Sequence, residues 1–274
     1  MLKLFKNSFK QTNDCIILAT PLIIFLSILS WYFSYASSTV DNIPKLILAG
    51  ITIFVMAAGF FSAWFYMVKK TLKFSNKLYV FDKDRAKAFG NLILSLPKGI
   101  GKLFLPFLGI IAISTIFYGF IFAIITYFVW KYIGTVNLDF FDIKNLMVSS
   151  KELIDEVSQL SKNELIVINC WYLLVLICTT ITSFITMLWI PEVVYCEKNP
   201  FKALYYAIKK IFISFPKSIL LFIYINILTF GISVLNTFLM FNPIAYFVVL
   251  LLYYYLIVYI VVLVFSYYEQ TFLK

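Results

Sequence analysis

Residues 244–266 read IAYFVVLLLYYYLIVYIVVLVFS and contain no charged side chain. An apolar run of this length crosses the ~30 Å hydrocarbon core of a bilayer as an α-helix. The run lacks the alternation of apolar and polar residues that marks a strand of a membrane barrel. The segment is therefore predicted to be a transmembrane helix, and it decides the class of the whole chain.

Five further uncharged apolar runs share this length and composition. The predicted spans are residues 16–35, 46–68, 103–130, 165–190, 218–240 and 244–266. The composition of the 274 residues agrees, because 62% are hydrophobic and soluble domains hold roughly 45–50%. We predict an all-α polytopic membrane protein with six transmembrane helices in a single membrane domain, residues 1–274.

The basic residues predict the orientation of these spans. Eighteen of the 23 Lys and Arg residues fall at the N-terminus, at Lys69–Lys102, at Lys198–Lys217 or at Lys274. Since cytoplasmic loops hold the excess of Lys and Arg, both termini are predicted to be cytoplasmic. The net charge of +10 then gathers on the inner face, which indicates anionic lipids of the inner leaflet as partners and argues against nucleic acid. A cleaved secretory signal is the alternative for the first span, since Ser34-Tyr35-Ala36 suits a signal peptidase.

A short motif repeats along the chain. SLPK at residues 95–98 recurs as SFPK at 214–217, and each copy joins a basic, helix-patterned stretch to a span. The N-terminus offers a shorter version, with Leu2, Phe5 and Phe9 on one face of a helix and Lys3, Lys6 and Lys10 on another. We predict three units, at about residues 1–68, 82–190 and 198–266, each an interfacial amphipathic helix followed by a two-span hairpin.

The interfacial helix of the third unit has the clearest boundaries. Asn199 is its predicted N-cap, Pro200 its first residue, and Pro216 marks the turn into the bilayer. Its predicted apolar face is Phe201, Leu204, Tyr205, Ile208, Ile211, Phe212 and Phe215. The predicted lipid-surface residues of the second and third units are Lys83, Arg85, Lys87, Lys198, Lys202, Lys209 and Lys210. Ordinary cytoplasmic linkers that obey the same charge rule are the alternative.

The outer loop, residues 131–164, is the largest segment outside the predicted spans on that side. Ser149 and Glu152 fit a capping box, and Leu153, Ile154, Val157 and Leu160 then share one helical face. We expect a short helix that covers the outer end of the bundle. Recognition of an external partner is the alternative.

Polar side chains form a row within the last three spans. They are Thr179, Ser183 and Thr186 in span four, Asn226, Thr229, Ser233 and Asn236 in span five, and Tyr255 and Tyr259 in span six. We expect these faces to meet, because polar side chains join membrane helices through hydrogen bonds. Two interpretations stay open: this polar seam holds the helices together, or it lines a path for a neutral or amphiphilic substrate.

The sequence carries few residues suited to catalysis. It has no histidine, its four cysteines form no CxxC pair, and no Walker, GxSxG or HExxH motif occurs. The spans hold no Asp, Glu, Lys or Arg, which argues against proton coupling. Glu192, Glu197 and Glu269 follow the inner ends of spans four and six, where we expect solvated carboxylates or pairs with a lysine. No catalytic residue, metal site or cofactor is predicted.

The stretch PEVVYCEKNPFKAL at residues 191–204 resembles a set of bacterial six-span membrane protein families. In these families a proline and a glutamate end span four, and an x-P-F-x-A-L start opens an amphipathic helix. The set includes the membrane domain attached to some glycerophosphodiester phosphodiesterases. A serine usually follows the Ala-Leu, whereas this chain has Tyr206-Ala207. The resemblance implies a bacterial cytoplasmic-membrane protein and transfers no catalytic residue, since the phosphodiesterase chemistry belongs to a soluble domain.

Together these observations favour a non-enzymatic membrane protein, a scaffold or accessory factor in lipid or envelope processes. A transporter of a neutral or amphiphilic small molecule through the polar seam is the alternative.

The predicted orientation has a direct test in a variant whose four native cysteines are replaced by serine. A cysteine placed at Lys144 should react with a membrane-impermeant maleimide in intact cells, and one placed at Lys87 should react only after permeabilisation. The opposite pattern of labelling would reverse the orientation.

Overall fold

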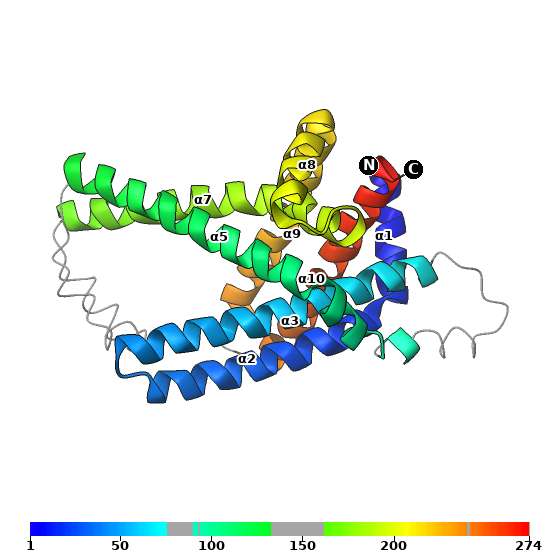
Figure 1. The fold of residues 1–274 in the computed structure, drawn as a ribbon, viewed down its shortest axis with the longest axis horizontal. Helices are drawn as coiled ribbons and strands as arrows, with labels where there is room; N and C mark the ends of the chain where they lie inside the picture. The colour runs from blue at the N-terminus through cyan, green and yellow to red at the C-terminus, as the bar shows by residue number, and fades with distance from the viewer. Residues whose placement is uncertain (76–89, 93, 133–161, 240–241, 274) are drawn as a thin grey trace. The chain divides into compact units, whose positions relative to one another are not determined.

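The computed structural model describes residues 1–75, 90–92, 94–132, 162–239 and 242–273, and all regular elements within them are helices (Figure 1). These are α1 (Leu2–Asp14), the 3-10 helix η1 (Ile16–Leu18), α2 (Ala19–Thr39), α3 (Ile43–Ser75), α5 (Leu96–Tyr132), α7 (Lys162–Tyr195), α8 (Pro200–Ile213), α9 (Phe215–Leu239) and α10 (Pro243–Phe272). Six helical segments are long and apolar enough to cross a membrane. The prediction of an all-α protein with six spans is confirmed, and the chain is an integral membrane protein.

The chain forms two compact units. The larger unit comprises residues 1–111 and 184–274, and the smaller unit comprises residues 112–183. α5 and α7 each contribute to both units. Within the smaller unit the ring of Phe122 in α5 lies 4.9 Å from that of Trp171 in α7. These two helices therefore pair there through aromatic side chains.

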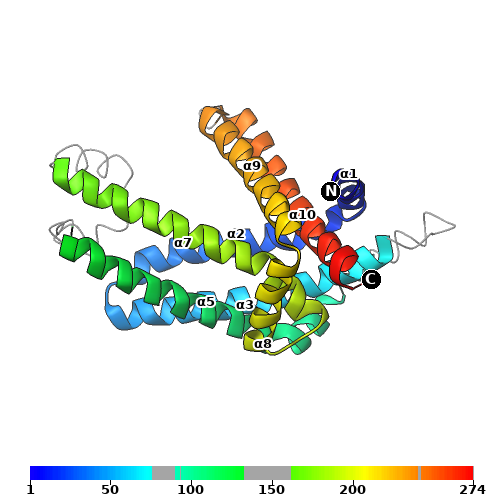
Figure 2. The ribbon, with the colours of Figure 1, turned by 90° about the horizontal axis from the view of Figure 1, so that it is seen from above.

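α10 is the central helix of the larger unit. It contacts α1, α2, α3 and α9, and Figure 2 shows α9 and α10 running side by side. Its C-terminal part, from Leu256 to Tyr268, is largely buried, whereas most side chains from Ile244 to Tyr253 are exposed. A helix that is apolar on all sides suits both surroundings, because one part packs against protein and the other faces acyl chains.

α1 packs against α10, and its most buried residues lie beside the predicted apolar face. Its buried residues are Leu4, Ser8 and Thr12. By contrast Leu2 and Phe9 of the predicted apolar face are 85% and 55% exposed. Small side chains at intervals of four let two helices approach closely. Phe9 also contacts Tyr255 and Tyr259 of α10, so both faces of α1 take part in its packing.

The repeated motif occupies the same structural position in both copies. α5 begins at Leu96 and α9 at Phe215, one residue after the serine of each motif. Both serines are buried, and each donates to a carbonyl of the turn before it, Ser95 to Leu92 at 2.6 Å and Ser214 to Lys210 at 3.0 Å. The motif thus ends one helix and begins the next.

The predicted boundaries of α8 are confirmed. Oδ1 of Asn199 accepts hydrogen bonds from the backbone amides of Phe201 and Lys202, and Pro200 is the first helical residue. α1 and α8 each precede a pair of long helices, as the predicted first and third units require. The corresponding helix of the second unit, except residues 90–92, and the outer-loop helix expected near residues 149–160 lie outside the described residues.

α3 and α5 cross at a glycine. A Cβ atom added to Gly99 would lie 2.8 Å from Cα of Ala63 and from Cβ of Tyr66, and 2.9 Å from the carbonyl oxygen of Ser62. The backbone of α5 therefore rests directly on small residues of α3. Gly101, two positions later, would meet no heavy atom within 4 Å.

This difference predicts opposite effects for two matched substitutions. Gly101→Ala should leave thermal stability unchanged or raise it, because alanine favours helix by roughly 0.5–1 kcal/mol over glycine. Gly99→Ala should lower it by about 1–3 kcal/mol, the usual range for overpacking. Thermal unfolding of both purified variants in detergent measures the difference. Equal stability of the two would show that α3 and α5 do not cross at Gly99.

Candidate functional site

Among the described residues of the larger unit, the one buried carboxylate lies at the end of α7. Glu192 follows Pro191 and is only 2% exposed. An ionised carboxylate held away from water is strongly destabilising unless a cation and hydrogen bonds compensate it. The partners of Glu192 therefore decide what this part of the molecule can do.

Two side chains from other helices compensate Glu192. Nζ of Lys210 in α8 lies 2.6 Å from Oε2 of Glu192. The hydroxyl of Tyr268 in α10 donates to the same oxygen and accepts a hydrogen bond of 2.6 Å from Nζ of Lys210. The three groups form a closed triangle, which we call the ionic triangle. The ammonium also lies 4.7 Å from the centre of the Tyr268 ring, a favourable cation–π position.

Further polar contacts surround the ionic triangle. Tyr195 stacks on Tyr268 at 5.7 Å and donates its hydroxyl hydrogen to Glu269. Nζ of Lys69 in α3 donates to the carbonyl of Val194 at 2.8 Å and lies 4.7 Å from the centre of the Tyr195 ring. The ends of α3, α7 and α10 are thereby tied together around the triangle.

A chain of buried hydroxyls continues from α8 into α9. The hydroxyl oxygen of Ser214 lies 3.0 Å from that of Ser218, which lies 3.1 Å from that of Tyr267. Tyr267 in turn donates to Ser214 at 3.2 Å. These bonds fix the turn between α8 and α9 against α10.

The geometry of the ionic triangle is that of a structural ion pair. Each of its three polar groups already has two partners within the triangle. Two pockets of the larger unit, of about 560 and 470 Å³, are lined by other residues. The described residues also contain no group of three His, Cys, Asp or Glu side chains placed to hold a metal ion. The carboxylate is thus engaged by side chains of the larger unit.

The sequence anticipated part of this arrangement. For carboxylates at the inner span ends the sequence predicts either solvation or a lysine partner, and Glu192 has the lysine partner. Lys210 was expected on the lipid surface, but its ammonium points inward to Glu192 and its side chain is only 22% exposed. Tyr268 was not singled out. The one available signal was a tyrosine directly before Glu269, at the end of an otherwise uncharged span.

The tyrosines of the predicted polar seam contact α1 and α9. Tyr255 donates to Oδ1 of Asn13 at 2.8 Å. The hydroxyl of Tyr259 lies 3.0 Å from that of Tyr224, and the ring of Phe9 lies edge-on to both Tyr255 and Tyr259. The structure thus brings these span-six residues to the N-terminal helix, a partner that the sequence did not indicate.

The remaining seam residues have other surroundings. Asn226, Thr229, Ser233 and Asn236 are exposed along α9. Asn226 donates to the carbonyl of Phe222 and Thr229 to that of Ile225, within their own helix. In α7, Thr179 and Ser183 are exposed and Thr186 is half-buried. The polar row of α9 is therefore uncovered by the described residues, and its role as packing surface or substrate path stays a prediction.

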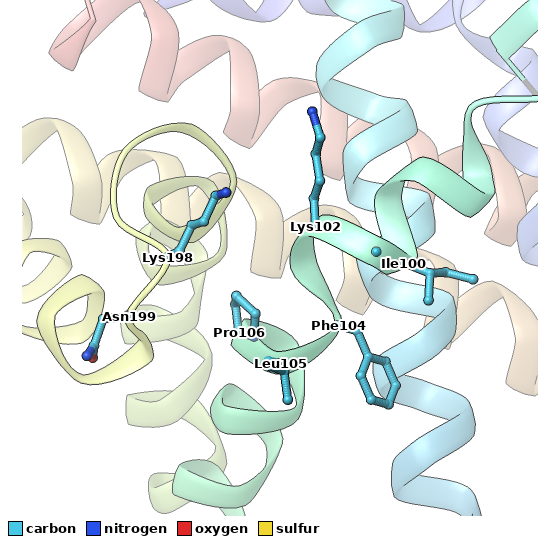
Figure 3. A pocket seen from close by; sticks show the side chains of 8 residues that line it. Ile100, Lys102, Phe104, Leu105, Pro106, Lys198 and Asn199 are labelled. Carbon is cyan, nitrogen blue, oxygen red and sulfur yellow. The ribbon is translucent and has the colours of Figure 1, made fainter.

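Three of the predicted lipid-surface lysines are exposed. They are Lys198, Lys202 and Lys209. Lys83, Arg85 and Lys87 lie outside the described residues. The first of the two pockets is the one that contains Lys198. It lies between the first turns of α5 and the segment that joins α7 to α8 (Figure 3).

Comparisons of the chain with protein-family models, with curated proteins and with solved structures gave no match.

The ionic triangle predicts a non-additive pair of substitutions. Lys210→Met should lower the free energy of unfolding by about 3–5 kcal/mol, because Glu192 is then a buried charge without its cation. Lys210→Met combined with Glu192→Met should recover most of that loss. Thermal unfolding and yield of the purified proteins measure both.

Lys209→Met provides the matched control, because Lys209 is the exposed neighbour of Lys210. It should change stability by less than about 0.5 kcal/mol. Additive losses in the double variant would mean that Lys210 and Glu192 do not interact.

Proposed function

We propose that this chain is a non-enzymatic protein of a bacterial cytoplasmic membrane, with both termini in the cytoplasm. On this proposal it serves as a scaffold or accessory factor in lipid or envelope processes. Its working parts are the outer surfaces of its helices and the basic side chains that adjoin them. The proposal includes no cofactor, and it does not specify a protein partner.

The observation that carries the proposal is the division of α8 into three faces. The buried face consists of Ala203, Ala207 and Ile211. A second face consists of Phe201, Tyr205 and Phe212, which are 67%, 65% and 71% exposed. Lys202 and Lys209 form a third, exposed face beside the aromatic one. A helix at a membrane surface places such an aromatic face among acyl chains and its lysines at the headgroups.

α1 adds a second set of exposed lysines. Lys3, Lys6 and Lys10 all lie outside the face that α1 packs against α10. Each lysine near an anionic leaflet contributes about 1 kcal/mol of attraction. The two short helices together supply five such lysines, enough to favour anionic lipids around this part of the protein.

The ionic triangle supports a role without catalysis. A general acid or base needs a substrate within hydrogen-bond reach. Glu192 is surrounded by its own partners, and neither pocket includes it. The best-protected carboxylate in the described residues is thus committed to holding helices together.

A transporter is the second candidate, and the uncovered polar row of α9 favours it. Asn226, Thr229, Ser233 and Asn236 face away from the rest of the larger unit. In hydrocarbon such side chains need polar partners or water. A neutral substrate that passes along this row would supply them.

The scaffold proposal predicts selective retention of anionic lipid. Full-length protein in vesicles of 70% phosphatidylcholine and 30% phosphatidylglycerol is extracted with styrene–maleic acid, and the two lipids in the resulting discs are quantified. The wild type should enrich phosphatidylglycerol, and Lys202→Glu with Lys209→Glu should reduce the enrichment by at least about two-fold. Vesicles of phosphatidylcholine alone provide the control for folding and extraction. Unchanged enrichment in the double variant would reject α8 as a lipid-binding surface.

The same preparation separates the two candidates. Neutral solutes such as glycerol are tested for flux into proteoliposomes that contain wild type, Asn226→Leu or Ser233→Leu. Flux through the wild type that both variants lose, with their thermal stability unchanged, would establish the transporter. No flux above protein-free vesicles favours the scaffold.

A further inference from the structure

The pocket between α5 and the α7–α8 segment lies where these two parts of the larger unit stand apart (Figure 3). Its volume is about 560 Å³, and all of its lining belongs to the larger unit. α5 and α8 touch further along α5, where a Cβ atom on Gly109 would lie 2.6 Å from Cγ of Pro200. The lining residue Gly101 has no heavy atom within 4 Å of the corresponding position. The pocket is thus a gap that opens before the contact of the two helices.

Two lysines bring positive charge to this pocket, one from each side. Lys102 belongs to α5 and Lys198 to the segment before α8, and both are exposed. Among the described residues neither takes part in an ion pair. The nearest acidic residue in sequence, Glu197, accepts a hydrogen bond of 3.0 Å from the backbone amide of Asn199. A third ammonium, that of Lys70, shares the ring of Tyr66 with Lys102, at 5.1 and 5.7 Å from its centre.

The start of α8 does not itself provide a free anion site. Its first amides already donate to Oδ1 of Asn199, at 3.0 Å from Phe201 and 3.3 Å from Lys202. An anion in the pocket would therefore be held by the two lysines. Because lysine offers rotatable donors on a long stem, it suits a phosphate group more than a fixed planar partner.

Apart from Asn199, the rest of the lining is apolar. Leu105 and Pro106 follow Lys102 by three and four residues, so the three residues share one side of α5, and Leu105 is 74% exposed. Ile100 and Phe104 are each two residues from Lys102 and lie on the other side of α5. A hydrocarbon chain suits such a wall, whereas a polar ligand would find no hydrogen-bond partner along it. A ligand that fits the whole pocket must carry an anionic group and a hydrocarbon portion.

We propose that this pocket binds an anionic glycerophospholipid, with its phosphate between Lys102 and Lys198 and an acyl chain along Leu105 and Pro106. The proposal rests on the proposed function in one respect, since it names the class of lipid on which a membrane scaffold would act. Lipid binding in this pocket differs from lipid binding at the exposed faces of α8. The exposed faces of α8 attract many lipids weakly, whereas the pocket holds one molecule in a defined place.

Native mass spectrometry of the full-length protein in detergent tests the proposal, with dioleoyl-phosphatidylglycerol and dioleoyl-phosphatidylcholine as the two probes. The wild type should retain one phosphatidylglycerol molecule about ten-fold more tightly than phosphatidylcholine. Lys102→Gln with Lys198→Gln should remove most of that ten-fold preference. Lys202→Gln with Lys209→Gln removes the same charge from α8 outside the pocket and should keep it.

Two further measurements separate the lipid from its headgroup. Leu105→Asn should weaken retention of both lipids, because it makes the apolar wall polar while leaving both lysines in place. Free glycerol 1-phosphate in hundred-fold excess should not displace phosphatidylglycerol. Displacement would assign the pocket to a soluble phosphate ester and overturn the proposed lipid.

Equal retention by the wild type and by Lys102→Gln with Lys198→Gln would also overturn the pocket. That result leaves the proposed function intact if Lys202→Glu with Lys209→Glu still reduces phosphatidylglycerol enrichment in discs. Loss of the enrichment effect with intact binding in the pocket would instead reject the α8 surface and keep the pocket. The two proposals therefore fail separately.

Discussion

A carboxylate buried in apolar surroundings must keep its cation, and Glu192 imposes this requirement on three helices. The penalty for removing each ion from water is several kcal/mol, and it is offset only when the partner and the remaining hydrogen bonds are in place. Lys210 comes from α8 and Tyr268 from α10. A shift of either helix by one turn would move a partner by ~5.4 Å and leave Glu192 uncompensated. The ionic triangle therefore fixes the register of α7, α8 and α10.

The position of Lys210 also fixes the rotation of α8. Lys210 lies three residues after Ala207 and seven after Ala203, so all three share the inward face. Lys209 is one residue earlier and projects about 100° away. Once Lys210 points inward, the aromatic residues Phe201, Tyr205 and Phe212 must point outward. The exposed aromatic and basic faces of α8 are thus a consequence of the buried ion pair.

Local features of this fold could be predicted from the sequence, and choices among partners could not. The six spans follow from uncharged length, and the start of α8 follows from Asn199 and Pro200, whose capping geometry involves only neighbouring residues. The burial of Ser8 and Thr12 in α1 could not be predicted, because both side chains are polar by composition. The hydrogen-bond partner of Tyr255 could not be predicted either. A phenol within a span needs a partner, but the sequence offered several, and the structure supplies Asn13 of α1.

Lys210 illustrates why a candidate site is harder to predict than a span. Lys209 and Lys210 are identical in type and adjacent, yet one is exposed and the other is paired with Glu192. The partners that distinguish Lys210 from Lys209 are Glu192 of α7 and Tyr268 of α10. The separation of buried from exposed charges also bears on function. Among the described residues the charge of Glu192 is enclosed by its partners, whereas Lys202 and Lys209 are exposed beside apolar side chains. Such lysines suit the recognition of anions at the boundary between headgroups and acyl chains.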